Sequence, residues 1–586
     1  MSMLTLPMEL TIASLKERYA TGALTPADVV AEIIRRSQSD AEMNIWITPP
    51  DLAWIQPYLD RLEGMDREQA PLWGIPFAVK DNIDLAGVPT TSGCPDFAYV
   101  PAAHAAVVTR LIEAGAIPVG KTNLDQFATG LVGTRSPYGE THNALRPELI
   151  SGGSSSGSAV AVARGQAVFA LGTDTAGSGR VPAALHGLVG WKPSLGAWPV
   201  SGLVPACESL DCITVFAHGL DDVLQVDQVV RGLDRDDPWS REVPFKTSGS
   251  RRLPSTIYLP KGPLEFFGPY ADEYRAQWDR TRQRLQQLDI PVAYIDTDLF
   301  AEAAALLYEG PWVAERWAAL GAFVESHPGS TFPVTEQILR SGENPIHHAS
   351  SLFQAQHRLQ DYKRRARQLL EDGVLVMPTA GGTWTREQVR EEPVAANRAM
   401  GLYTNHCNLL DLCAVAVPAG EAAADVPFGI TLFALSGQEE VLVALAERHE
   451  RREAEPMTLV AVCGLHMRGL PLEPQMLAHG ARFVREALTA PTYCLAKLPT
   501  QPAKPGLIKQ GFGGAAITLE VWEMPLSRFG AFAAAIPAPL GIGKVELEDG
   551  TEVPGFICEG YAGQEAEDIT SFGGWRAAIA ATLRMS

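Results

Sequence analysis

The segment from Ser151 to Ser194 is rich in glycine and small residues and reads SGGSSSGSAVAVARGQAVFALGTDTAGSGRVPAALHGLVGWKPS. A Gly- and Ser-rich turn leads into a small-residue helix, and an apolar strand then leads into a second Gly-rich loop and another helix. Predicted strands and helices alternate in the same way before this segment, from about residue 74 onward. This alternation predicts an α/β fold with a layered core.

The first Gly-rich turn, SGGSSSG at 151–157, is compatible with three functions: a flexible linker, a phosphate-binding loop or part of a catalytic site. A linker would not run directly into an apolar helix and a buried strand. A phosphate-binding loop needs the spacing GxxxxGK[ST] or GxGxxG, and the turn has neither. The catalytic interpretation is therefore favoured.

The second Gly-rich loop, GTDTAGSGRVP at 172–182, places Ser178 on a tight turn before a helix. A serine at such a turn is well placed for nucleophilic attack, and nearby backbone N–H groups can stabilise an oxyanion. No GxSxG motif with evident His and Asp partners accompanies it, and we interpret His186 as structural. Lys80, after the apolar GIPFAV, can act as the base if burial keeps it neutral. A surface lysine at a strand end is the alternative.

The composition limits the classes of function. The chain has 586 residues, 46% of them hydrophobic, a net charge of −20 and a pI near 5.1. The length predicts more than one domain, and the acidic balance argues against nucleic acid as a partner, because phosphate binding needs clustered lysines and arginines. We find no secretory signal, no apolar run long enough for a membrane span and no CxxC pair among the eight cysteines. We therefore expect a cytoplasmic protein with no membrane partner, metal site or disulfide framework.

Four motifs follow one another along the chain: GIPFAVKDNID, GKTNLDQFATG, SGGSSSGSAVAVA and GTDTAGSGRVPAALHGLVGWKPS. Together they resemble the amidase signature family over roughly residues 10–446. The resemblance implies a mixed central sheet covered by helices. It also implies hydrolysis of amides by a Ser–cis-Ser–Lys triad, with no metal or organic cofactor.

The same resemblance assigns the residues of the triad. Ser178 is the nucleophile, Ser154 is the cis-serine that relays the proton, and Lys80 is the base. The backbone N–H groups expected to form the oxyanion hole are those of Thr175, Ala176, Gly177 and Ser178. Ala176 stands where the family usually has glycine, and Gly179 where a branched apolar residue is common. Because both residues are small, we expect the loop to form.

The segment LLYEGPWVAERWAAL at 306–320 bears on the substrate. Tyr308 and Arg316 would share one face of a single helix, although Gly310 and Pro311 could kink it. A tyrosine hydroxyl and an arginine can together bind a small carboxylate, whereas an interfacial stripe with a surface ion pair is the alternative. The segment resembles that of allophanate hydrolases, a group within the family, in which the matching Tyr and Arg bind the substrate carboxylate.

Further expectations follow from this second resemblance. Gly130, in ATGLVGTRSPYG, falls on a loop that resembles the substrate-side wall, and Arg135 on the same loop is either a second anion contact or a surface charge. The implied reaction converts allophanate (urea-1-carboxylate) to ammonia and carbon dioxide in urea degradation. A homodimer and a functional link to a biotin-dependent urea carboxylase are also implied. A general or malonamate-type amidase, or a non-catalytic subunit of a carboxylase or amidotransferase assembly, is the alternative.

The chain changes character near residue 447, where the charged run ERHERREAEP is either a linker or a solvated helix end. We predict an amidase domain over 1–450, a linker over 451–456 and a C-terminal domain over 457–586. GLHMRGLPL, LEVWEMP and GGWRAAI resemble the C-terminal domain of allophanate hydrolases, a small α+β domain similar to γ-glutamylcyclotransferase-like barrels. This implies that His466 assists the breakdown of N-carboxycarbamate, a structural histidine being the alternative. Glu523 is either an acid or base, or a solvated side chain.

Overall fold

The structure, a computed structural model, describes residues 6–245, 251–453, 457–563 and 566–585. The chain divides into two compact units, residues 1–451 and 452–586, which are described separately below. Helix α16 (Glu439–Glu453) continues into the predicted linker, whose remaining positions 454–456 lie outside the described residues. The described part of that segment is therefore the end of a helix.

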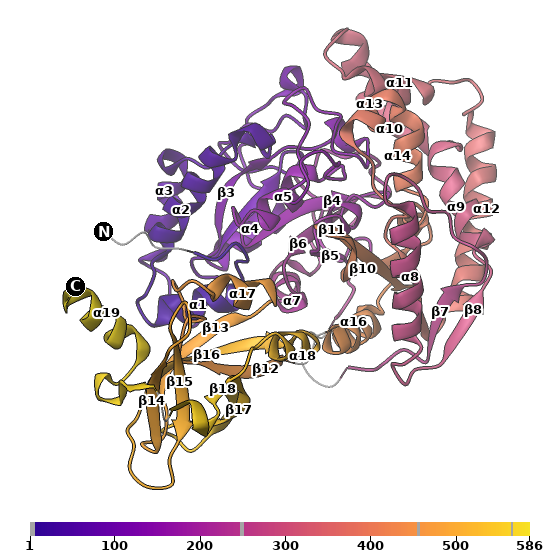
Figure 1. Ribbon diagram of the computed structural model, residues 1–586. Helices are drawn as coiled ribbons and strands as arrows, with labels where there is room; N and C mark the ends of the chain where they lie inside the picture. The colour runs from indigo at the N-terminus through magenta and orange to yellow at the C-terminus, as the bar shows by residue number, and fades with distance from the viewer. Residues whose placement is uncertain (1–5, 246–250, 454–456, 564–565, 586) are drawn as a thin grey trace. The chain divides into compact units, whose positions relative to one another are not determined.

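A mixed sheet forms the centre of the first unit (Figure 1), which confirms the α/β prediction. Among the described residues it has eleven strands in the order β1-β3-β2-β4-β6-β5-β10-β11-β9-β7-β8. Strand β2 runs parallel to both of its neighbours, whereas the strands from β4 to β9 pair antiparallel. The strands are β1 (Trp46–Thr48), β2 (Pro76–Lys80), β3 (Ile117–Thr122), β4 (Phe169–Asp174), β5 (Val189–Lys192), β6 (Cys212–Ala217), β7 (Thr256–Pro260), β8 (Val292–Ile295), β9 (Gly373–Pro378), β10 (Leu412–Ala423) and β11 (Val426–Leu435).

Helices pack on this sheet and bury its apolar side chains. Helices α4 and α7 contact each other and the sheet, and α5 and α6 form a second such pair. Thr25 followed by Pro26 is a pair that predicts the start of a helix from the sequence, and Thr25 does cap α2 through a hydrogen bond from the backbone N–H of Asp28, with Pro26 at the first helical position. The helices are α1 (Ile12–Ala20), α2 (Pro26–Ser39), α3 (Leu52–Leu62), α4 (Ala106–Glu113), α5 (Ser156–Ala163), α6 (Val181–Ala184), α7 (Leu220–Val230), α8 (Ala271–Leu285), α9 (Asp298–Tyr308), α10 (Trp312–Ser326), α11 (Pro333–Ser341), α12 (Ala349–Leu370), α13 (Arg386–Glu391), α14 (Pro393–Met400) and α15 (His406–Leu409).

The parallel strands β2 and β4 decide where a site can form. They pair directly, with Val79 opposite Leu171. Their carboxyl ends therefore lie at one edge of the sheet, which is where open α/β sheets usually hold their ligands. Lys80 is the last residue of β2, and the loop that carries Ser178 follows the end of β4.

Strand β10 differs from the sequence expectation that AVAVPAG ends as a strand at its proline. The strand continues past Pro418 to Ala423 and pairs with β11. The register of the pair shifts after Pro418, consistent with an irregularity at a residue that has no N–H to donate.

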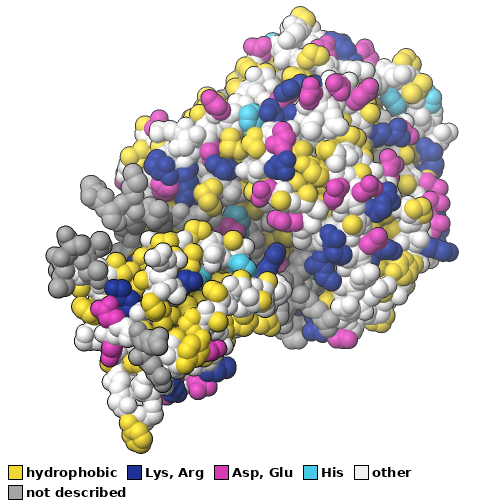
Figure 2. Space-filling view, viewed as in Figure 1, with side chains coloured by type: hydrophobic (Ala, Val, Ile, Leu, Met, Phe, Trp, Pro, Cys, Tyr) yellow, Lys and Arg dark blue, Asp and Glu magenta, His cyan; other side chains and the backbone are white. Residues whose placement is uncertain are grey.

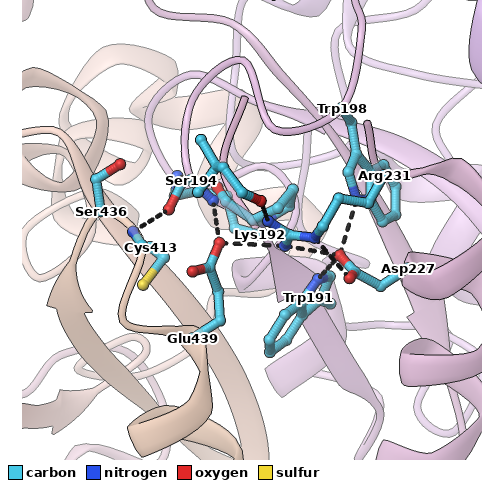
Figure 3. A network of polar contacts seen from close by, with 12 residues as sticks. Trp191, Lys192, Ser194, Trp198, Asp227, Arg231, Cys413, Ser436 and Glu439 are labelled. Atoms are coloured by element: carbon cyan, nitrogen blue, oxygen red, sulfur yellow. Dashed lines mark hydrogen bonds and ion pairs between the residues drawn. The ribbon is translucent and has the colours of Figure 1, made fainter. Parts of the chain in front are cut away.

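A buried polar network ties helices α7 and α16 to strand β5 (Figure 3). Asp227, on α7, accepts a hydrogen bond of 2.9 Å from the indole N–H of Trp191, on β5. The guanidinium of Arg231 forms ion pairs with Asp227 at 2.8 Å and with Glu439, the first residue of α16, at 3.1 Å. Because buried charges need partners, we interpret this network as structural.

The second unit is an α+β domain with its own core. Its described strands form a sheet of five in the order β13-β16-β12-β18-β17 and a sheet of three in the order β15-β14-β19. The strands are β12 (Met457–Val462), β13 (Arg482–Leu488), β14 (Tyr493–Leu498), β15 (Lys504–Lys509), β16 (Thr518–Pro525), β17 (Leu540–Glu546), β18 (Glu552–Cys558) and β19 (Glu567–Asp568), and the helices are α17 (Glu473–Ala478), α18 (Leu526–Ala534) and α19 (Trp575–Met585). Its likeness to γ-glutamylcyclotransferase-like barrels stays a prediction.

The surface carries charges of both signs. On the face of the first unit seen in Figure 2, acidic side chains are interspersed with lysines and arginines. The described residues on that face therefore form no continuous basic surface of the kind that nucleic acid binding needs. Among the described helices, none combines the length and the apolar character that crossing a bilayer would require.

Candidate active site

Lys80 lies at the centre of the candidate site and is fully buried. Its Nζ donates hydrogen bonds of 2.8 Å to Ser154 Oγ and of 2.6 Å to Thr173 Oγ1. The alternative of a surface lysine at a strand end is therefore wrong. The structure brings together Lys80 and Ser154, which lie 74 residues apart in the sequence.

The surroundings of Lys80 favour its neutral form. Burial lowers the pKa of its ammonium group to about 7, against the opposing effect of the carboxylates of Asp125, Asp211 and Asp174. At neutral pH a substantial fraction of the amine thus carries a free lone pair. Such an amine can accept a proton, as a general base must.

Ser154 stands on a turn that glycine makes possible. The Gly153–Ser154 peptide bond is cis, as the resemblance implies. A Cβ atom added to Gly153 would lie 2.0 Å from the Oδ2 atom of Asp125, so no larger residue fits there. The backbone N–H of Asp125 donates to the carbonyl of Ser154 at 3.0 Å. The Asp125 carboxylate also accepts hydrogen bonds from the backbone N–H groups of Val132, Gly133 and Arg135.

The loop after β4 is held by an internal ion pair. Asp174 accepts hydrogen bonds of 2.8 and 2.9 Å from the guanidinium of Arg180, and both side chains are fully buried. Burial opposes ionisation of Asp174, but the charge and hydrogen bonds of Arg180, together with Lys192 and the N–H of Gly179, outweigh it and hold the pKa of that carboxyl below its usual value. Asp174 and Arg180 thus stabilise the loop, as bidentate buried pairs do.

The Asp174 carboxylate also affects the predicted oxyanion hole. The N–H of Gly177 donates to Asp174 Oδ1 at 2.9 Å and is therefore occupied within the loop. Gly177 has a φ of +136°, and a Cβ there would lie 2.3 Å from Thr404 Oγ1, so the position requires glycine. The roles of the Thr175, Ala176 and Ser178 N–H groups stay predictions.

Ser178 is buried on this loop, with 3% of its surface exposed. Within the described ranges, the structure gives its hydroxyl no hydrogen-bond partner. Lys80 and Ser154, the last two members of the predicted relay, are in hydrogen-bond contact, whereas the proton transfer from Ser178 through Ser154 stays a prediction.

Tyr308 and Arg316 come together, but not as expected. The segment is not one helix: α9 ends at Tyr308 and α10 begins at Trp312, with the break at Gly310 and Pro311. Arg316 is 1% exposed, and its guanidinium carbon lies 5.4 Å from the centre of the Tyr308 ring. Its Nη1 donates to Thr129 Oγ1 at 3.0 Å. The contact therefore depends on how two helices pack, not on the spacing within one.

Gly130 lies next to Thr129 in the loop that Asp125 organises. A Cβ atom at Gly130 would lie 2.5 Å from Asp125 Oδ2. The close approach of the Asp125 carboxylate therefore explains why this position has a glycine. Its backbone neighbour Leu131 donates its N–H to Asn397 Oδ1 at 2.7 Å. The structure thus places Gly130 beside the Arg316 contact, and its role toward substrate stays a prediction.

Sequence reasoning missed four groups around the site: Thr173, which binds Lys80; Thr129, which binds Arg316; Asp125; and Asp211. Burial raises the pKa of Asp211 to about 6, and its carboxylate accepts a hydrogen bond from the hydroxyl of Thr175. Asp125 lies within the quoted motif GKTNLDQFATG, which was the available signal for it.

His466 lies in the second unit, at a cavity of about 480 Å³. Its Nε2 is 3.0 Å from Gln475 Oε1, and its ring stacks on Phe556 with centroids 4.8 Å apart. Burial lowers its pKa, and the charge of Lys504 adds to that effect. The cavity walls are mostly apolar and include Leu465, Leu472, Phe532, Ile536, Leu540 and Phe556. Glu523 instead pairs with Arg482 at 3.1 Å.

The described residues contain no group of three or more metal-binding side chains. The hydroxyls of Ser154 and Thr173 around Lys80 can support proton transfer. His186 packs as expected: its Nδ1 is 2.8 Å from the Pro182 carbonyl, and its Nε2 accepts from the Ala144 N–H at 3.2 Å.

Each of the two units matches a known protein family. Residues 28–443 match the family described as Amidase, and residues 458–580 match the Allophanate hydrolase C-terminal domain. The urea amidolyase of Saccharomyces cerevisiae is 40% identical over 91% of this chain and 31% of its own length. That of Lachancea kluyveri is 41% identical over 94% of this chain and 32% of its own length. The chain thus spans about a third of these curated relatives.

A solved structure covers nearly the whole chain. The allophanate hydrolase of Kluyveromyces lactis superposes with a TM-score of 0.70 at 36% identity, over 98% of this chain and 100% of that one. The fold of both units is therefore that of a known enzyme structure.

Proposed function

The chain belongs to the amidase family, and from this premise we propose that it hydrolyses allophanate, the carboxylated form of urea, to ammonia and carbon dioxide. The observation that carries the substrate is Arg316, a buried guanidinium beside the Tyr308 ring. No carboxylate lies within ion-pair distance of it in the part of the chain that the structure describes. A buried arginine without an acid suits an anionic ligand that completes the pair.

The first step is amide cleavage in the first unit. Ser178 Oγ attacks the terminal amide carbon, and its proton passes through Ser154 to Lys80. The C–N bond then breaks, and the proton returns along the same route to the departing ammonia. Water hydrolyses the acyl-enzyme to N-carboxycarbamate. The hydrogen bond from Lys80 to Ser154 and the lowered pKa of Lys80 support these roles.

The second step belongs to the C-terminal unit. N-carboxycarbamate takes up a proton on nitrogen, the C–N bond breaks and carbon dioxide leaves, and the remaining carbamate decomposes to ammonia and a second carbon dioxide. We assign the proton transfer to His466. Its place in the wall of the cavity in this unit, with Nε2 held 3.0 Å from Gln475 Oε1, supports the role.

We place the protein in the cytoplasm, as a homodimer, with a functional link to a biotin-dependent urea carboxylase that supplies allophanate. The similarity to urea amidolyases supports the link. The eight cysteines, none of which forms a disulfide, are consistent with a reducing compartment. Sedimentation of the purified chain tests the dimer.

The decisive experiment compares ammonia release from allophanate and from propionamide, an uncharged amide. We expect wild type to prefer allophanate strongly. Arg316→Ala should lower kcat/KM for allophanate about 100-fold, because a charged hydrogen-bonded contact contributes about 1.5–3 kcal/mol, and should remove most of the preference. Arg364→Ala, which removes an exposed arginine paired with Asp361 on α12, is the matched control and should keep the preference for allophanate.

Two results would contradict the proposal. Equal activity on both amides would indicate a general amidase of the same family. A Ser178→Ala variant that retained its cellular role would indicate a non-catalytic subunit.

A further inference from the structure

A second buried arginine lies beside the first. Arg135 is 1% exposed, and its guanidinium donates to two backbone carbonyls, those of Thr129 at 2.9 Å and Pro393 at 2.8 Å. Its Nε is buried without a hydrogen-bond partner, as is the Nε of Arg316. Both side chains thus keep unused donors in a buried place. The surface-charge alternative for Arg135 is therefore wrong.

Neither guanidinium forms an ion pair with a carboxylate among the described residues. Among the described residues, no carboxylate lies within 4.0 Å of the guanidinium of Arg135 or of Arg316. Asp125 is nearby, but it accepts the backbone N–H of Arg135 at 2.9 Å instead of the guanidinium. Carboxylates farther away, Asp125 for Arg135 and Asp211 and Glu315 for Arg316, oppose the effect of burial on the two charges. A bound anion would add the direct ion pair that both guanidinium groups lack.

Thr129 joins the two arginines. Its carbonyl accepts from Arg135 Nη1 at 2.9 Å, and its hydroxyl accepts from Arg316 Nη1 at 3.0 Å. Burial lowers the pKa of Arg135, and the charge of Arg316 adds to this effect. The two charges therefore act on one another across a single residue.

An open volume lies next to this junction. Arg135 and Tyr308 both line a cavity of about 400 Å³, together with residues of α9, α11 and α14. A small carboxylated amide fits easily within such a volume. One wall includes Asn405, which follows Thr404, and Thr404 Oγ1 donates to the Ala176 carbonyl of the Ser178 loop at 2.7 Å.

The alternative is that Arg135 has only a structural role. Arg36 is an example of a buried arginine with such a role. Arg36 is 7% exposed and donates to the Gly165 and Leu6 carbonyls at 3.0 and 2.6 Å. It also forms an ion pair with Glu32 at 2.9 Å. Arg135 has comparable carbonyl contacts but no such acid.

We propose that Arg135 is a positioning and specificity-determining residue for the substrate carboxylate. Its charge adds to that of Arg316 in attracting the anion, and its hold on Thr129 orients the hydroxyl that Arg316 contacts. The subsite therefore takes carboxylated amides through two arginines instead of one. This inference rests on the proposed function and adds a residue to the same site.

The test uses a matched pair of stable substrates, malonamate and malonamide, which differ only in whether one end is a carboxylate or an amide. The measured quantity is the ratio of kcat/KM for the two. Arg135→Gln should lower the ratio about tenfold, mainly through KM for malonamate, and Arg135→Lys, which keeps the charge, should recover part of it. Arg36→Gln, the matched control, should lower the melting temperature but leave the ratio at the wild-type value.

The outcomes separate this inference from the proposed function. A wild type without preference for malonamate would overturn the proposed function. A wild type with preference, together with an unchanged ratio in Arg135→Gln, would overturn the role of Arg135. Thr129→Val keeps the carbonyl but removes the hydroxyl, and it should also lower the ratio. If Arg135→Gln does not fold, a wild-type ratio in Arg135→Lys overturns the positioning role, because that variant lacks the guanidinium that binds the Thr129 carbonyl.

Discussion

The two units surround their candidate bases with opposite environments. Lys80 is enclosed by the hydroxyls of Ser154 and Thr173, with carboxylates further out. His466 instead lies against aromatic rings and has one amide partner, Gln475. The first environment offers a route for protons, whereas the second offers a largely apolar space around one proton donor. The two environments match the two proposed steps, amide cleavage in the first unit and release of carbon dioxide in the second.

The strongest test of this difference removes the proton route. Lys80→Met should lower kcat/KM for allophanate by at least about 10³-fold, because the amine is the only base assigned to the first step. Ammonia release from allophanate measures it. Lys16→Met, on the surface of α1, is the control and should retain full activity. Substantial activity in Lys80→Met would remove the distinction between the two units.

A smaller effect should appear as a pH dependence. Below its pKa of about 7 Lys80 is protonated and cannot accept a proton, so kcat/KM should rise with pH and level off above about 8. Two pH units below the pKa, the value should be about 100-fold under the plateau. Initial rates between pH 5 and 9 measure this rise of kcat/KM with pH. In Arg316→Ala the midpoint of the pH dependence should stay at the wild-type value, because Arg316 acts on substrate binding. A midpoint near 10 would show that Lys80 behaves as an ordinary lysine.

The smallest effect is expected in the second unit. His466→Asn should leave the first ammonia unchanged but slow the release of carbon dioxide about tenfold, which is less than general acid–base catalysis typically contributes. Isotope-labelled allophanate followed by carbon NMR distinguishes the intermediate from the products. His479→Asn, at the same cavity, is the matched control. Unchanged carbon dioxide release in His466→Asn would make His466 structural.

The sequence predicted the features that local patterns encode. An apolar run that ends at Lys80 indicated a strand end, and the Gly-rich loop around Ser178 indicated a tight turn; both are present. Thr25 at a helix start is a further case. Each of these depends on neighbours within a few residues, which is the range of propensities and caps.

Contacts across long stretches of chain were beyond this reasoning. Thr173 reaches Lys80 over 93 positions, and Thr129 reaches Arg316 over 187. Tyr308 and Arg316 were placed together on one helix, whereas the break at Pro311 makes their contact a matter of helix packing. Sequence spacing contains no information about such packing unless a family pattern supplies it.

The buried amine of Lys80 links activity to the stability of the fold. The folded state holds Lys80 with a pKa of about 7, and the unfolded chain has the ordinary value near about 10.4. Between these values the unfolded state binds one more proton, so stability should increase with pH by up to about 1.4 kcal/mol per unit and decrease as pH falls toward 7. Lys80→Met should lack this dependence in denaturant titrations at pH 7 and 9. The buried amine of Lys80 thus lowers the free energy of unfolding more at neutral pH than in alkali, and Lys80→Met would remove this contribution.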